Sequence, residues 1–134
     1  MLNAIDIATA ALLADSGITA LVGRRVWPVI APQDSALPNI VVTQISEIDV
    51  NHMSGNSGRL PESRISIVSR GTTATEMMNL ADTVKIALRD IQHQSIGGSP
   101  DVTIQKASTD VTQFFDEPPV FEQTADYRIR WRSP

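Results

Sequence analysis

The chain has 134 residues, of which 42% are hydrophobic and 19% are charged, so we expect one domain over residues 1–134 with a core of ordinary size. It contains no cysteine, which excludes disulfide frameworks, thiolate zinc sites and a cysteine nucleophile. The net charge of −4 argues against a dedicated nucleic-acid binder, because such proteins usually carry a basic excess. The apolar segment 4–14 is too short to span a membrane, and the first basic residue is Arg24. We therefore expect no membrane segment and no secretory signal.

The first predicted element is an N-terminal helix. Apolar residues recur at helical spacing from Leu2 to Leu13, with polar side chains off that stripe. Gly17 is typical of the position that ends a helix, so we expect the helix to stop there. Residues 18–22 then predict one further apolar turn, which Gly23 ends.

Two strands joined by a stiff connection come next. Residues 25–29 predict a short strand, and Pro28 makes it an edge or a bulge because proline cannot donate to a strand ladder. Prolines bound the connecting loop 32–38 at both ends. Residues 39–50 are rich in Val and Ile and carry the strongest strand signal, and a change of phase in their alternation predicts a bulge near Ser46–Glu47.

A long polar loop separates this strand from its predicted hairpin partner. Residues 51–63 are polar and contain two glycines, and loops of that length are more often functional than merely connecting. The partner strand is predicted at 64–69. Thr73 with Glu76 then forms a capping box, and apolar residues at helical spacing from Met77 to Ile91 predict a second helix.

The C-terminal part predicts two more strands. A weak strand covers about residues 102–113, the sequence "DEPP" turns the chain, and residues 121–131 return as its hairpin partner. The order is therefore α-β-β-β-α-β-β, which is not the regular alternation of a doubly wound sheet. We predict an α+β fold with two main helices packed on one face of a mostly antiparallel sheet of four to five strands.

The sequence contains no pattern that indicates catalysis, a cofactor or a metal. Asp49 and His52 form a D-x-x-H pair with no further ligand nearby, and His93 near a helix C-terminus is explained by the helix dipole. The "GNSG" at 55–58 lacks one residue of a nucleophile elbow, and the "IGGSPD" at 96–101 follows a helix where an anion site would precede one, so it is predicted to be a turn. Nothing in the sequence pairs any two of the scattered carboxylates for acid–base chemistry. These carboxylates are Glu47, Asp49, Glu62, Asp116, Glu117 and Glu122. We predict that the protein is not an enzyme.

One charge pattern has a direction. Arg128, Arg130 and Arg132 alternate with apolar residues, so they would project from one face of the last strand. Two interpretations stay open: a solvated sheet face, or a patch that meets acidic side chains of a partner subunit or a passing nucleic-acid backbone. Trp27 and Trp131 are predicted to be core or core-edge residues.

Four stretches carry a family resemblance: "ALVGRRVWP", "PQDSALPNIVVTQIS", "ISIVS" and "TATEMMNLADTVKIALRD". They resemble the tail completion proteins of long-tailed bacteriophages and prophages, the group that includes head–tail joining and tail-terminator proteins. The resemblance covers nearly the whole chain. It implies a non-enzymatic structural protein of the virion, assembled in the cytoplasm of the bacterial host. Such a protein caps the head-proximal end of the tail tube, commonly as a six-membered ring, and joins the tube to the neck.

The resemblance also implies partners. These are other copies of the chain in a homo-hexameric ring, the major tail tube protein, and a head–tail connector or stopper protein, with at most non-specific contact to passing DNA and no membrane. For these contacts we expect the residues Pro32, Gln33, Asp34, His52, Met53, Asn56 and Arg59, with Arg128, Arg130 and Arg132 facing the lumen or a neighbouring subunit. Two alternatives stay open: a protein of another neck or minor tail layer, and a small α+β ligand-binding domain.

Overall fold

The computed structural model describes residues 3–32, 35–50, 60–107, 111–116 and 119–132. The elements follow one another in the order α1 (Ala4–Leu13), α2 (Ser16–Val22), β1 (Val26–Pro28), β2 (Asn39–Val50), β3 (Leu60–Gly71), α3 (Ala74–Leu88), β4 (Gln94–Ile96), β5 (Ser99–Lys106), β6 (Val111–Asp116) and β7 (Pro119–Arg130).

The predicted α+β class is confirmed, but the sheet is larger than predicted. Within the described residues it has seven strands in the order β1-β2-β3-β7-β5-β4, and β6 also pairs with β7. The pairing of β1 with β2 is parallel and every other pairing is antiparallel, so the sheet is mixed. The prediction of four to five strands was wrong because β4 is only three residues long and because one predicted strand divides into two.

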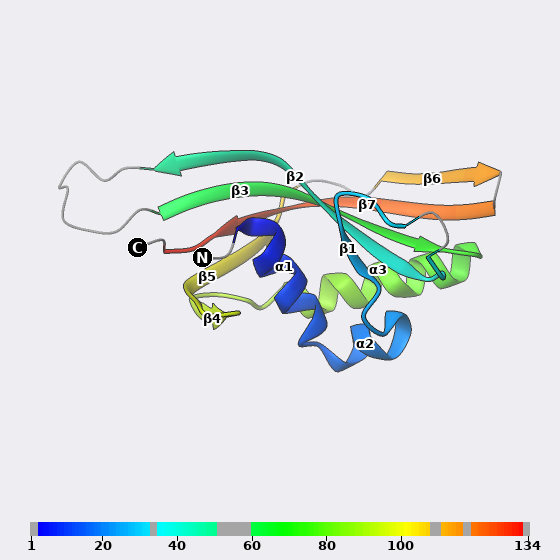
Figure 1. The fold of residues 1–134 in the computed structure, drawn as a ribbon, viewed down its shortest axis with the longest axis horizontal. Helices are drawn as coiled ribbons and strands as arrows, with labels where there is room; N and C mark the ends of the chain where they lie inside the picture. The colour runs from blue at the N-terminus through cyan, green and yellow to red at the C-terminus, as the bar shows by residue number, and fades with distance from the viewer. Residues whose placement is uncertain (1–2, 33–34, 51–59, 108–110, 117–118, 133–134) are drawn as a thin grey trace.

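The helices of the described residues, α1, α2 and α3, cover one face of this sheet (Figure 1). Their buried apolar side chains meet those of the alternate strand positions that point toward them, and the result is one continuous core. The largest fully buried side chains are Ile7, Leu12, Ile18, Ile40, Ile65, Ile67, Leu80, Leu88, Ile104 and Ile129. Trp131 is buried in this core, as predicted. Trp27 is half-buried but pairs with Val41 on the other face of the sheet, so it lies outside this core. No described helix covers the opposite face of the sheet.

The N-terminal region forms two helices where one helix and a turn were predicted. α1 ends at Leu13, and Asp15 begins α2 as its N-cap, with Oδ1 accepting a hydrogen bond from the Ile18 backbone N–H at 3.1 Å. Gly17 therefore lies inside α2 and does not end α1. A Cβ at this glycine would lie 3.2 Å from Cγ2 of Thr83, so its small size lets α2 approach α3 closely. The end predicted at Gly23 is confirmed.

The helix predicted from the capping box is confirmed as α3. The Thr73 hydroxyl accepts a hydrogen bond from the Glu76 backbone N–H at 3.1 Å. The Glu76 carboxylate reaches one residue further back than a standard capping box and accepts from the backbone N–H of Thr72 at 2.9 Å. These bonds satisfy donors at the start of the helix that would otherwise lack partners.

The long hairpin of β2 and β3 is also confirmed. Its register shifts between Gln44 and Ser46, next to the predicted bulge, and β3 is longer than the predicted strand 64–69. The single strand predicted at 102–113 was wrong because β7 is long enough to pair with two separate strands. β7 has 12 residues, and β5 pairs with its C-terminal part while β6 pairs with its N-terminal part, so two separate strands lie along the same edge of β7.

Candidate functional site

The loop that follows β1 is tied to the sheet by its own polar groups. The Trp27 indole Nε1–H donates to the Ser35 hydroxyl at 2.9 Å, and the Arg25 Nε–H donates to the Pro38 carbonyl at 3.0 Å. The Asn39 amide is fully buried and donates to the Ser35 hydroxyl at 3.3 Å and to the Ala36 carbonyl at 3.2 Å. These bonds hold the described part of the loop in one position against the end of β2.

Two exposed apolar side chains stand at the start of this loop. Val29 is 62% exposed and Ile30 is 78% exposed. Val29 has a φ of 65°, which is a strained conformation for a β-branched residue. Its backbone N–H donates to the Val42 carbonyl at 2.8 Å, so a sheet hydrogen bond maintains the strain. Strain that the surrounding structure maintains is a reason to look for a function at this position.

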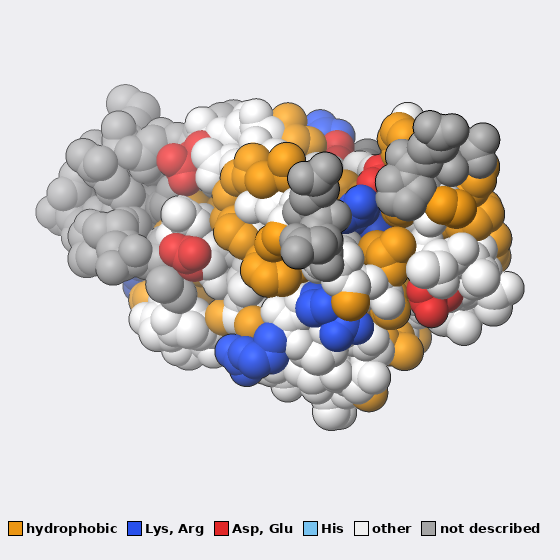
Figure 2. All heavy atoms as spheres, turned by 45° about the vertical axis from the view of Figure 1, so that its right-hand side comes forward, with side chains coloured by type: hydrophobic (Ala, Val, Ile, Leu, Met, Phe, Trp, Pro, Cys, Tyr) orange, Lys and Arg blue, Asp and Glu red, His pale blue; other side chains and the backbone are white. Residues whose placement is uncertain are grey.

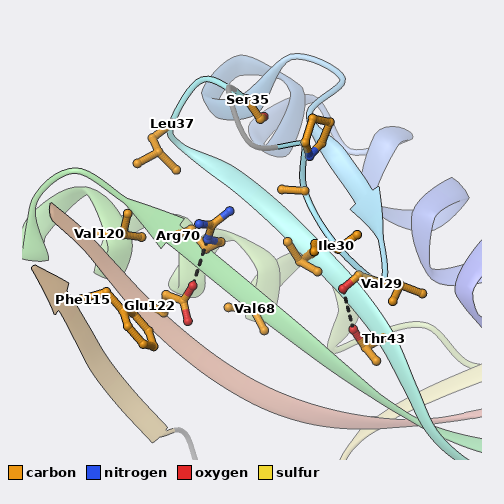
Figure 3. A pocket seen from close by; sticks show the side chains of 13 residues that line it. Val29, Ile30, Ser35, Leu37, Thr43, Val68, Arg70, Phe115, Val120 and Glu122 are labelled. Carbon is orange, nitrogen blue, oxygen red and sulfur yellow. Dashed lines mark hydrogen bonds and ion pairs between the residues drawn. The ribbon is translucent and has the colours of Figure 1, made fainter. Parts of the chain in front are cut away.

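A groove of about 580 Å³ lies on the uncovered face of the sheet, between this loop and β6 (Figure 3). Val29 and Ile30 line it on one side and Phe115 on the other, and Val68 forms part of its floor. Val41, which pairs with Val68, also lines the groove. The polar groups of the floor include Arg70 and Glu122, whose side chains form an ion pair at 2.9 Å. The groove is therefore mainly apolar, and its charges are compensated within the chain.

A second, smaller depression of about 360 Å³ lies on the other side of β6, next to the start of α3. Its lining includes Phe114, Phe121 and Met78. The rings of Phe114 and Phe121 pack with their centroids 4.6 Å apart. Successive residues of β6 thus face different depressions, Phe114 the helix side and Phe115 the groove. Figure 2 shows hydrophobic side chains exposed at this β6–β7 end of the molecule and again in the middle of the face in view.

The other half of the uncovered face carries arginines that are paired with carboxylates. Arg128 and Arg130 both contact Glu62 on β3, at 2.7 and 3.3 Å. Arg64 contacts Asp126 across the same pair of strands at 3.1 Å. These side chains are partly exposed, so each pair contributes little stability, but each reduces the local charge excess.

The third arginine of the alternating pattern lies beyond the end of β7. Arg132 contacts the Asp101 carboxylate at 3.4 Å, and the same carboxylate lies 2.5 Å from Nδ1 of His93. His93 and Asp101 both have positive φ, and the backbone N–H of His93 donates to the Thr103 hydroxyl at 3.2 Å. This cluster joins the segment after α3 to β5 and the C-terminal end. Gly97 and Gly98 between β4 and β5 have positive φ, which confirms the turn predicted for "IGGSPD".

Most of the predicted partner-binding residues lie outside the described residues. These are Gln33, Asp34, His52, Met53, Asn56 and Arg59. Pro32 lines the groove, together with apolar residues that the sequence patterns did not indicate. Val29, Ile30, Phe114 and Phe115 were missed because isolated apolar residues in strands ordinarily belong to the core. The available signals were Pro28, which disfavours a central strand, and two adjacent phenylalanines, which cannot both face one core.

The described residues contain no group of three or more His, Cys, Asp or Glu side chains placed to hold a metal ion. Within the same part of the chain, no single helix is long and apolar enough to cross a membrane. α1 and α2 pass that test only as a pair, with a bend of 90° between them.

Comparison with known proteins agrees with this arrangement of elements. The family model described as "Tail completion protein gp17" matches residues 8–130. A solved structure titled "Virion of native gene transfer agent (GTA) particle" contains a chain similar to this one, with a TM-score of 0.61 and 16% sequence identity, over 97% of this chain and 95% of that chain. A search of curated protein sequences found no match.

The protein is a structural component of a bacteriophage tail. More specifically, because the family model matches most of its length, the chain belongs to the tail completion protein gp17 family.

Proposed function

We propose that this protein caps the head-proximal end of the tail tube as a homo-hexameric ring and joins the tube to the neck. The single observation that carries the proposal is the family match over residues 8–130. The similarity to a chain in a virion particle supports a location in the virion, at the tail or the head–tail interface. Assembly would take place in the cytoplasm of the bacterial host, and the role is not enzymatic.

The geometry supports a role in assembly because the chain presents apolar surface where no described helix covers the sheet. A small ligand-binding domain would enclose its ligand in a cavity with converging polar groups. The groove is instead open along the surface, and its central ion pair is already satisfied within the chain. Exposed apolar residues beside an open sheet face are typical of protein–protein contacts. We therefore favour binding of the major tail tube protein and of a connector or stopper protein over binding of a small molecule.

The arginine pattern supports a limited role in DNA passage. If Arg128 and Arg130 face the lumen or a neighbouring subunit, their contact with Glu62 leaves less positive charge for phosphate groups. A lumen that bound DNA strongly would slow its passage, since affinity rises with the number of phosphates neutralised. Only non-specific contact with passing DNA is proposed.

The experiment is to add the purified protein to polymerising tail tube protein from the same phage or prophage and to image the tubes by negative stain. Tubes should stop elongating and carry a ring of additional density at one end. Tubes that elongate as they do without the protein would contradict the proposal. Phage heads are then added. If tubes that carry a ring fail to attach to the heads, the alternative of another neck or minor tail layer would be favoured.

A surface variant with a matched control sharpens this test. Ile30→Asp places a charge on the side chain that is 78% exposed at the groove, so the fold should be unaffected. Ile86→Asp makes the same change at a side chain that is 58% exposed on α3 and lines neither the groove nor the depression beside β6. If the groove faces a partner, Ile30→Asp should weaken capping while Ile86→Asp leaves it close to wild type.

A further inference from the structure

Two edges of the sheet carry strands long enough to pair with another strand. β1 and β4 are each three residues long, and β1 ends in Pro28, so both form short edges of the kind that resist strand addition. β6 has six residues and, within the described residues, pairs only with β7. β2 pairs with β1 only through Ile40–Val42, so its outer edge is unpaired from Thr43 onward in the described part of the chain.

β6 lacks the features that usually protect an edge strand. Residues 111–115 read "VTQFF", with no lysine, proline or glycine. Val111, Phe114 and Phe115 are 55%, 51% and 50% exposed. Because Phe114 lines the helix-side depression and Phe115 lines the groove, a strand added to β6 would cover apolar surface on both faces of the sheet.

The free part of β2 has a complementary character. Thr43 lines the groove, and Ile45 at the bulge is 52% exposed. Gln44 pairs with Ile65 and therefore lies on the other, helix-covered face. The edge of β2 thus combines unpaired backbone with an exposed apolar side chain.

We propose that β6 of one copy adds to the free edge of β2 in a second copy, so that the sheet continues from subunit to subunit. The two edges lie toward opposite ends of the long axis of the molecule (Figure 1). A head-to-tail contact requires two different complementary patches on each subunit, and these edges meet that requirement. A foreign strand would cover one edge and leave the other unpaired. The inference rests on the proposed ring and adds which surfaces join its subunits.

The size of the contact predicts how it behaves. Half-exposed phenylalanines each contribute about 100 Å² of apolar surface, since an aromatic side chain buries roughly 150–250 Å² in full. With the valine and isoleucine side chains, the apolar part of the contact comes to a few hundred Å², well below the ~1,200 Å² of a stable interface. We therefore expect a monomer in dilute solution and a subunit contact that holds only at high concentration or when several subunits are bound side by side.

The absence of cysteine allows a direct test by disulfide trapping. Gln113 pairs with Glu122, which lines the groove, so its side chain lies on the same face as Thr43 and Ser46, while its backbone also borders the helix-side depression. The double variants Gln113→Cys/Thr43→Cys and Gln113→Cys/Ser46→Cys are oxidised mildly at about 1 mM protein, where even a weak contact is occupied. Two strands separate β6 from β2 within one chain, a distance of roughly 14 Å that excludes an intramolecular bridge.

One further variant is a negative control, and another is a second pair that should cross-link. Gln113→Cys/Gln44→Cys places the thiols on opposite faces and should not cross-link. Thr112→Cys/Gln44→Cys places both thiols on the helix side and is a second positive pair. The unfolding midpoint of each variant, measured without oxidant, verifies that the fold is retained.

The expected result is a ladder of disulfide-linked species in the same-face double variants, at least tenfold above the opposite-face variant. Absence of any ladder would overturn the inference, as would equal cross-linking by Gln113→Cys alone, which would indicate β6 paired with β6. The ring function is tested separately on tail tubes. Rings on tubes without same-face cross-links would refute only the strand pairing, and a cross-linked ladder that never caps tubes would refute only the proposed function.

Discussion

The buried amide of Asn39 provides a sharp test of how the proline loop is held. Asn39 is the first residue of β2, and its side chain is fully buried. It donates to the Ser35 hydroxyl and to the Ala36 carbonyl, and its Oδ1 accepts from Nη1 of Arg70 at 3.4 Å. Asn39→Ala removes all three bonds and leaves the Ala36 carbonyl without this donor.

The expected loss follows from these bonds. The two neutral bonds are each worth about 1 kcal/mol, and the third is long and involves an arginine that keeps its contact with Glu122. The Ser35 hydroxyl also keeps its hydrogen bond from Trp27. We expect the free energy of unfolding to fall by about 2 kcal/mol, which corresponds to a melting temperature lower by roughly 7 °C for a chain of this size.

The assay is urea unfolding monitored by far-UV circular dichroism. The m-value, which is the slope of the free energy of unfolding against urea concentration, is compared between variants. Asn79→Ala is the matched control, because Asn79 is exposed on α3, and its stability should stay within about 0.5 kcal/mol of wild type. If Asn39→Ala also stays within about 0.5 kcal/mol of wild type, the loop is not held by this amide. A changed m-value would instead show that the surface exposed on unfolding has changed or that unfolding is no longer two-state.

Three further predictions concern α3, the β6–β7 hairpin and the paired arginines. Thr73→Ala should lower the free energy of unfolding by about 1 kcal/mol through loss of the N-cap. Thr75→Ala, two residues further along and inside the helix, should change it by less than half as much. A double-mutant cycle with Phe114→Ala and Phe121→Ala should give a coupling energy of about 1 kcal/mol, and a value near zero would contradict the ring contact. Glu62→Gln should cost less than about 1 kcal/mol but free two arginines, so the salt concentration that elutes the protein from heparin should rise; unchanged elution would mean that these pairs do not limit anion binding.

The parts of the fold that could be predicted are those with strong local signals. A few neighbouring residues are enough to predict each of these elements. They are the capping pair at the start of α3, the Val- and Ile-rich sequence of β2 and the alternation in β7. Elements that depend on distant partners were missed. β4 is a strand only because β5 pairs with it, and the division of the predicted strand 102–113 depends on the length of β7.

The candidate site was less predictable than the fold. Pro32 was selected from its place in a stiff loop, and the structure puts it at the groove. The exposed apolar residues around it were not selected, because no periodicity distinguishes an apolar side chain that faces a core from one that faces solvent. The alternating arginines were recognised, but their contacts with Glu62 and Asp101 join segments more than thirty residues apart in the chain.

The α+β class, the main helix, the long hairpin and a family resemblance that the family match confirms could all be predicted from the sequence. These follow from local periodicity, capping and short motifs, all of which act over a few neighbouring residues. The unpaired edges of the sheet, the apolar side chains outside the core and the charges that compensate one another could be identified only in the folded chain. Those properties depend on the order of the strands in space, because a strand's free edge is defined by the neighbour that it lacks.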